Sequence, residues 1–560
     1  MTNLAQTLRR LFTAGEPSQV PTDWREVLRR DRAQWEAARS RAQSGPKVLI
    51  ATSVGGHKPV VTLDTALALA LTLAGADVHL LLCDEFLPAC ERCVVTAYPK
   101  LEEYLATGPA RLYCRSCFRH GAQTYDQLRL TLHRYTHYAT AEDRTTAAKL
   151  SAEIPSDEIA GYTLDGIAVG EHASAGALRF FARGTLRGEP LAEPILRHYF
   201  HAALLTTFSV RRLLQTHSFV CASFHHGIYV PQGLVGEVAR KHGVRVANWQ
   251  VAYRKRRFIF SHQETYHHTL LVEPATSWES IRWNAKLEQQ AMDYLQSRWQ
   301  GSRDWIYFHE KPQEELSAIT GEGGVDFSKP CIGLLTNVMW DAQLHYRTNA
   351  FPNMLEWVLQ TIAYFAKRPD LQLLVRIHPA EVRGSIPSRQ QIGREIREAF
   401  PELPPNVFII PPENAVSTYV AMLKCNAVII YGTKTGVELT SMGIPVVVAG
   451  EAWIRNKGLT LDANSPKEYF ELLDRLPLEG RMDEQTTRRA RMYAYHFFFR
   501  RMIPVECIEP STGKLPFEIR LRNLKDLKPG RNPGLDTISN GILRGTEFVY
   551  RAEEYPAETD

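Results

Sequence analysis

Three kinds of segment are missing from this sequence of 560 residues. The longest apolar stretch, around Ala66 to Leu73, is too short to span a bilayer. The start of the chain has no charged segment followed by an apolar run and a cleavage site, so a secretory leader is not indicated. No fixed-period repeat and no low-complexity tract occurs, which argues against a solenoid. We therefore expect a globular, cytoplasmic protein.

A strong excess of one charge is also missing. The chain has 66 Lys and Arg against 61 Asp and Glu, a formal net charge of +5. This balance argues against nucleic acid as a partner and suits an enzyme that binds anionic phosphates locally. Near the start of the chain, beside Arg9 and Arg10, an apolar stripe lies at helical spacing: Leu4, Leu8, Leu11 and Phe12. The stripe is typical of a docking helix or of a peripheral contact with the inner face of a membrane.

The length predicts two principal domains, because a single core stops growing well before 560 residues. We place a helical arm at 1–45 and an acceptor-side α/β domain at 46–318. A second, donor-binding α/β domain follows at 319–480, and a return helix with a C-terminal tail at 481–560.

Short apolar runs alternate with helical spacing in both halves of the chain. In the first half, the run Val48 to Thr52 is followed by Gly55 and Gly56, a helical stretch to Leu73 and a second run at Val78 to Cys83. Another such unit runs from Phe219 to Val246. In the second half, strands are expected to begin at five positions: Cys331, Leu371, Val407, Ala427 and Ile444. The alternation predicts an α/β fold with two doubly wound parallel sheets.

A strand-to-helix turn in the second half carries hydroxyl groups and a lysine. The buried run Ala427 to Ile430 leads into Thr433, Lys434 and Thr435, and Glu438 follows within the helix. Such a turn leaves backbone N–H groups free, and the helix dipole favours a phosphate there. Lys434 would add a charge, and Glu438 could accept hydrogen bonds from a ribose. The alternative is an ordinary capping box made by Thr435 and Glu438.

A second polar strand end supports the phosphate interpretation. The strand Leu371 to Ile377 contains Arg376 and ends at His378 and Pro379. The carboxyl ends of parallel strands meet at one edge of a sheet, so both turns would face one crevice. Two charged elements at one edge favour a shared anion site.

The motifs in this half resemble those of a known family. They are GLLTNVMWDA from Gly333, VRIHPAE from Val375, NAVSTY from Asn414, YGTKTGVELTSMGIPVVVAGEAW from Tyr431, and KGLT from Lys457. In their order and spacing, residues 331–475 are similar to the C-terminal domain of the capsule polysaccharide biosynthesis glycosyltransferases, which include β-Kdo transferases. The resemblance implies a GT-B-like fold with His378 and Pro379 beside the nucleotide phosphates. It also implies Thr433 and Thr435 on the phosphate loop and Glu438 on the ribose, with Ser417 of NAVSTY joining the donor-binding residues.

In a GT-B enzyme the catalytic base is expected on the N-terminal, acceptor-binding domain. A base must remove the proton of the acceptor hydroxyl while positive groups stabilise the departing phosphate. Two histidines stand at predicted strand ends, His57 after the glycine pair and His226 before Gly227. Both are candidates for the base, and the alternative is that each only satisfies loop carbonyls.

Four of the nine cysteines form two CxxC pairs, Cys90 with Cys93 and Cys114 with Cys117. Two such pairs can surround one tetrahedral zinc ion. We predict a structural Zn²⁺ site in an insertion at about 85–120, with an iron–sulfur cluster or unligated cysteines as the alternatives. A site closed by four sulfur ligands would not take part in the chemistry.

Together these observations predict a glycosyltransferase that moves a sugar from a nucleotide-sugar donor to a hydroxyl of a surface, capsular or lipid-linked glycan. One alternative is a nucleotide-sugar epimerase of the same two-domain shape, which needs no acceptor. An alternative from another class is a zinc-ribbon protein that binds nucleic acid, although the cysteine pairs lack the basic and aromatic surface that such a protein needs.

Overall fold

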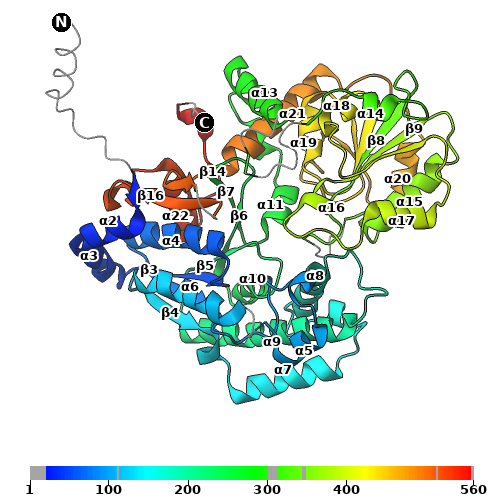
Figure 1. The fold of residues 1–560 in the computed structure, drawn as a ribbon. Coiled ribbons are helices and arrows are strands. Elements are labelled where there is room, and N and C mark those ends of the chain that lie inside the picture. The colour runs from blue at the N-terminus through cyan, green and yellow to red at the C-terminus, as the bar shows by residue number, and fades with distance from the viewer. Residues whose placement is uncertain are drawn as a thin grey trace, which may run out of the picture.

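The computed structural model describes residues 21–109, 113–299, 304–305, 312–342, 348–511 and 515–556. The apolar stripe at Leu4 to Phe12 lies outside these residues. Two large sheets, each with helices packed on it, form the two halves of the molecule (Figure 1). No helix of the described ranges is both long and apolar enough to cross a membrane.

The first sheet has seven strands. Their order is β14 (Met502–Pro504), β7 (Arg257–His262), β6 (Arg245–Val251), β5 (Cys221–His225), β2 (Lys47–Ser53), β3 (Asp77–Leu82) and β4 (Thr131–Arg134). The strands from β6 to β4 pair in parallel, as predicted for a βαβ pattern. The strand β7 pairs antiparallel with both of its neighbours, β6 and β14, so this sheet is mixed rather than wholly parallel.

Both faces of the first sheet are covered, so nearly every residue of its central strands β2, β3 and β5 is buried. Along β2, Val48 and Ile50 pack on one side with α4 (Lys58–Leu73), and Leu49 and Ala51 pack on the other. The remaining helices are α2 (Trp24–Arg30), α3 (Arg32–Ala42), α5 (Leu101–Thr107), α6 (Arg115–Asp126), α7 (Ala141–Glu153), α8 (Val169–Phe181), α9 (Ala192–Thr216) and α10 (Gln232–Lys241). A short linking region follows with α11 (Tyr266–Val272), α12 (Thr276–Glu279), α13 (Ala285–Trp299) and α14 (Ser317–Thr320).

The second sheet has six strands, and every pair in it is parallel. The order is β10 (Val407–Ile410), β9 (Gln372–Arg376), β8 (Cys331–Leu335), β11 (Ala427–Ile430), β12 (Val446–Val448) and β13 (Leu461–Asp462). Its helices are α15 (Met354–Phe365), α16 (Ala380–Arg383), α17 (Ile392–Ala399), α18 (Thr418–Leu423), α19 (Thr435–Ser441) and α20 (Pro466–Leu473). The strand order reverses between β8 and β11, which is where doubly wound sheets bind ligands.

The last part of the chain does more than the predicted return helix and tail. After α21 (Glu484–Tyr495), which packs on α19 and α13, the chain adds β14 to the first sheet (Figure 1). The strands β15 (Ile508–Pro510) and β16 (Phe517–Leu521) then form a small sheet with β1 (Thr22–Asp23), and α22 (Pro533–Arg544) packs on α4 and β14. These short strands carry no clear periodicity, so the sequence did not predict them.

A carboxylic acid lies in the core beneath the first sheet. Asp64 of α4 is fully buried, and it accepts hydrogen bonds from Thr52 Oγ1 at 2.7 Å and Trp249 Nε1 at 3.1 Å. Burial raises the pKa of Asp64 from 3.8 to about 7, although both hydrogen bonds favour the ionised form. The folded state therefore prefers protonated Asp64, and this contribution to stability is lost as the pH rises through about 7.

Replacing Asp64 with asparagine is expected to remove this pH dependence. Relative to the wild type, Asp64→Asn should gain about 2–3 kcal/mol of stability between pH 5 and pH 8, because the neutral amide pays no cost of ionisation. Thermal melting of both proteins across this pH range measures the difference, with Asp126→Asn at an exposed position as the control. A constant difference between the two melting temperatures would show that Asp64 is already ionised.

Candidate functional site

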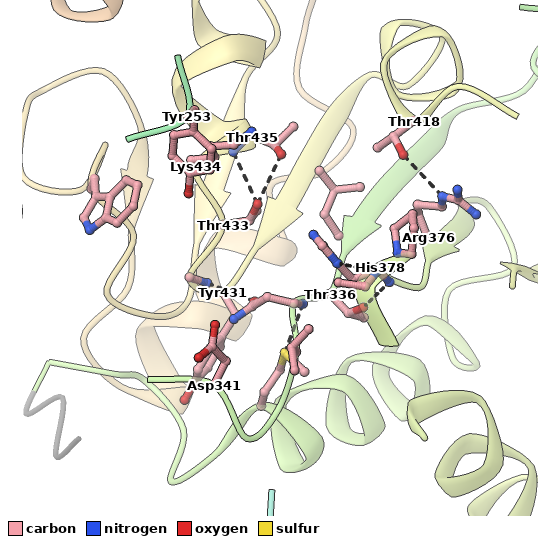
Figure 2. Close-up of a pocket in the computed structure, with 18 of the residues that line it drawn as sticks. Tyr253, Thr336, Asp341, Arg376, His378, Thr418, Tyr431, Thr433, Lys434 and Thr435 are labelled. Atoms are coloured by element: carbon pink, nitrogen blue, oxygen red, sulfur yellow. Dashed lines mark hydrogen bonds between the residues drawn. The ribbon is translucent and has the colours of Figure 1, made fainter. Parts of the chain in front are cut away.

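A cavity of about 410 Å³ opens at the carboxyl edge of the second sheet, where β8, β9 and β11 end (Figure 2). This volume lies within the range of small-molecule sites. The wall includes Thr336, His378 and Thr433 from these strand ends. Tyr253 and Tyr266, which follow strands of the first sheet, line it as well. The two polar turns that the sequence singled out therefore border one cavity, as expected for a shared site.

The turn after β11 presents its hydroxyl groups to this cavity. Thr435 N donates to Thr433 Oγ1 at 3.3 Å, and the two threonine hydroxyls lie 3.1 Å apart (Figure 2). The helix α19 begins at Thr435 with Lys434 at its N-cap, and no side chain caps it. The alternative of a capping box between Thr435 and Glu438 is therefore wrong. At the start of α19, the side-chain acceptor for Thr435 N is Thr433 Oγ1, two residues earlier, and the N-cap residue supplies none.

Glu438 lies behind this turn in a buried group of charges. Its Oε1 accepts from Lys434 Nζ at 2.9 Å and from Arg298 Nε at 2.8 Å, and Arg298 also pairs with Asp304. Burial opposes ionisation, but the charges of Lys434 and Arg298 lower the pKa of Glu438 to about 2. Glu438 is 1% exposed and is not part of the cavity wall. In this structure its carboxylate binds protein cations, so its position gives no support to the predicted ribose contact.

Lys434 does border the cavity. Its Nζ lies 4.8 Å from the centre of the Tyr253 ring, and the bond to Glu438 holds the ammonium group in place. Burial lowers the pKa of Lys434, and repulsion by the charge of Arg298 lowers this pKa further. The lysine is thus a positioned cation at the edge of the cavity, as the predicted phosphate contact requires.

His378 faces the same cavity from the end of β9 (Figure 2). Ala380 N donates to His378 Nδ1 at 3.1 Å, so Nδ1 is the acceptor and Nε2 carries the proton of the neutral ring. Its backbone N–H donates to Thr336 Oγ1 at 3.0 Å. Burial, then the nearby charges of Lys434 and Arg376, lower the pKa of His378 to about 4. The imidazole is therefore a neutral donor at physiological pH.

Arg376, predicted as a donor-binding residue, is hydrogen-bonded to the protein itself in this structure. Its guanidinium donates to Pro411 O at 2.6 Å, to Asn414 O at 3.0 Å and to Thr418 Oγ1 at 3.2 Å. The side chain touches the cavity, yet these bonds hold the segment 411–418 against β9 (Figure 2). Ser417 and Pro379 both line the cavity, and each is the N-cap of a short helix, α18 and α16.

Sequence reasoning missed part of the wall. Thr336, Asn337 and Asp341 line the cavity and follow β8 in the motif GLLTNVMWDA. This motif supports the family resemblance, but the sequence did not indicate that its residues belong to the site. Their position after a buried strand was the available signal. Tyr253, Tyr266 and His267 reach the cavity from the first half of the chain.

The two candidate bases lie at neighbouring strand ends of the first sheet. His57 follows β2 and His226 follows β5, and neither is part of the cavity wall. The His226 ring stacks on Tyr229 with 5.0 Å between ring centres, and Tyr229 OH donates at 2.9 Å to Asp341, which lines the cavity. Tyr266, another wall residue, lies 6.0 Å from the His226 ring. His226 is therefore one layer behind the wall.

His57 belongs to a polar group that the sequence did not predict. Its Nδ1 lies 3.1 Å from Glu91 Oε1, and its ring centre lies 5.2 Å from that of His225. Burial lowers the pKa of His225 well below its usual range, with a further contribution from His57. For Glu91, burial opposes ionisation, but the hydrogen bond from His57 and its charge lower the pKa below the usual range.

The four cysteines of the two CxxC pairs do not form a compact group of four sulfurs. Cys90 Sγ and Cys93 Sγ lie 4.0 Å apart, a separation that two ligands of one zinc ion could have. Cys117 Sγ accepts a hydrogen bond from Gly56 N at 3.0 Å. Within the described ranges, no three cysteine sulfurs lie within 4.8 Å of one another. The four-sulfur zinc site is not assembled in this arrangement, and it stays a prediction.

Comparison with known proteins gives one family match. Residues 329–477 match the family described as capsule polysaccharide biosynthesis protein. No curated protein matches the chain.

Solved structures show weaker likenesses. The Thermosulfurimonas dismutans KpsC beta Kdo 2,4 transferase is 12% identical over 55% of this chain and 87% of its own, with a TM-score of 0.33. The beta Kdo 2,7 transferase of the same protein is 14% identical over 51% and 79%, with a TM-score of 0.30. A Neisseria meningitidis UDP-GlcNAc 2-epimerase is 11% identical over 80% and 95%, with a TM-score of 0.23. At such low scores these likenesses establish no shared activity.

The family match spans β8 to α20, and it therefore contains all the strand ends that build the cavity in the second sheet. It also contains each motif on which the resemblance was based. Residues 329–477 are thus similar to the capsule polysaccharide biosynthesis family, as the motifs predicted.

Proposed function

We propose that this protein is a glycosyltransferase that moves a sugar from a nucleotide-sugar donor to a hydroxyl group of a surface or capsular glycan. The observation that carries the proposal is the convergence of His378, Thr433, Lys434 and Thr435 on one cavity at the point where the strand order reverses. Neutral and charged donors at such a point suit a phosphate ester.

In this proposal the donor phosphate lies against the turn after β11. His378 Nε2–H donates to one phosphate oxygen, and Lys434 places its charge near another. As the bond to the sugar breaks, negative charge grows on the leaving phosphate, and the same two groups stabilise it. Glu438, itself fixed by Arg298, holds Lys434 in advance, so the ammonium group needs no reorganisation during the reaction.

The acceptor then approaches from the side of the first sheet. Tyr253, Tyr266 and His267 form this side of the cavity. We favour His226 as the base, because its ring lies 6.0 Å from that of Tyr266, a residue of the cavity wall. Its pKa is lowered by burial, so its ring is neutral and able to accept a proton at physiological pH.

Nucleotide binding tests the donor site. A cytidine, uridine or guanosine phosphate that binds the native protein should raise its melting temperature, by an amount equivalent to about 2.7 kcal/mol at a hundred times Kd. His378→Ala should weaken that affinity roughly 10- to 100-fold, because a hydrogen bond to a charged group contributes about 1.5–3 kcal/mol. His137→Ala, at an exposed position far along the chain from the site, is the matched control. Equal affinities for wild type and His378→Ala would contradict the placement of the phosphate.

Turnover tests the base. The backbone of His226 has a φ of 62°, a left-handed conformation that asparagine tolerates, so His226→Asn is the suitable variant. It should lower the rate of sugar transfer about 10²- to 10⁴-fold and leave nucleotide affinity unchanged. Release of nucleotide in step with glycosylation of the acceptor distinguishes a transferase from an epimerase, which changes the donor without an acceptor. Wild-type turnover in His226→Asn would show that another group is the base.

A further inference from the structure

Three potential metal ligands meet at the carboxyl end of the first sheet, outside the donor cavity. His57 comes from the turn between β2 and α4, Glu91 from the loop after β3, and His225 from the last residue of β5. One ligand atom from each side chain lies within 4.8 Å of the other two. Three elements far apart in the sequence therefore converge on one point.

Two members of this group are buried in the protein, and the third is partly exposed to solvent. Glu91 is 5% and His225 6% exposed, whereas the side chain of His57 is 32% exposed. A small ion could thus reach the group past His57. A buried carboxylate beside two imidazoles also supplies the kind of donors that divalent metals bind.

The hydrogen bonds of His225 leave one ring nitrogen with a lone pair. Gln250 Oε1 accepts from the backbone N–H of Val251 at 3.2 Å, so this atom of the amide must be the oxygen. The same oxygen lies 2.6 Å from His225 Nε2, which therefore carries the proton. His225 Nδ1 is then a buried acceptor, and within the described residues it finds no hydrogen-bond partner. A buried acceptor without a partner is costly in a structural role and is what a metal ligand requires.

Outer contacts hold the carboxylate as well. Gln232 Nε2 donates to Glu91 Oε1 at 3.0 Å, and Arg179 donates to the backbone carbonyl of Glu91. Amide and backbone partners of this kind orient the ligands in protein metal sites. Both Gln232 and Gln250 are uncharged, so they support the ligands without competing for the charge of a cation.

We propose that His57, Glu91 and His225 bind a divalent transition-metal ion such as Zn²⁺. Two histidines and one glutamate are a known zinc ligand set, and they leave a coordination position open for water or a substrate oxygen. With bonds of about 2.0–2.2 Å the ligand atoms would lie roughly 3.4 Å apart. The distance between His57 Nδ1 and Glu91 Oε1, 3.1 Å, is close to this value. The site is separate from the predicted four-cysteine site, and it does not depend on the proposed transferase activity.

A metal-free reading of the same residues is a proton relay, in which Glu91 orients His57 through the 3.1 Å hydrogen bond. That arrangement does not use the lone pair on His225 Nδ1 and leaves this buried acceptor without a partner among the described residues. Direct measurement of metal binding separates the two.

The experiment uses the full-length protein, freed of metal with a chelator and titrated with Co²⁺. The wild type should bind one equivalent more than His225→Gln. That equivalent should give the absorption of cobalt bound by nitrogen and oxygen, with no thiolate-to-cobalt charge-transfer band. It should also remain when Cys90 and Cys93 are both replaced by serine, and Zn²⁺ should displace it.

Two further variants keep the test independent of folding defects. Gln250→Ala leaves all three ligands in place and should weaken cobalt binding roughly 10- to 100-fold, the usual effect of losing an outer partner. His242→Gln, at an exposed position after α10, should bind as the wild type does. The proposal is overturned if His225→Gln binds as much cobalt as the wild type, or if the lost equivalent carries a thiolate band.

Discussion

Parallel pairing of β8, β9 and β11 is the constraint on which the candidate site depends. Because parallel strands end at the same edge, the residues that follow each strand are brought together although they are far apart in the chain. Thr336, His378 and Thr433 follow the ends of three neighbouring strands by one, two and three residues. The reversal of strand order between β8 and β11 separates the following helices, and the cavity lies in the space that they leave.

Buried charges then shape this cavity from behind. Arg298 comes from α13, outside the second sheet, and it pairs with Glu438 and Asp304. Such ions are costly to bury, so they are retained only with partners in good geometry. The consequence at the surface of the cavity is a lysine in a defined position. The same logic applies to Arg376, whose guanidinium holds the segment that carries Ser417 and Thr418.

The first sheet has a second polar edge, at the ends of β2, β3 and β5. Tyr229, which stacks on His226 at this edge, donates a hydrogen bond to Asp341 in the cavity wall. His226 lies next to the cavity, whereas the group of His57, Glu91 and His225 lies one step farther away and has the donors of a metal site.

Local pattern in the sequence was enough to predict the alternation of strands and helices, the parallel second sheet and the polar turns at 376–379 and 431–435. These features depend on apolar periodicity and on residues adjacent in the chain, which a sequence displays directly. The roles of Glu438 and Arg376 depended on partners elsewhere, Arg298 and the segment 411–418, and so did the contact of Glu91 with His57. Only the tertiary structure decided them, because the pairing of a buried charge depends on which distant side chain packs against it, and no local pattern records that choice.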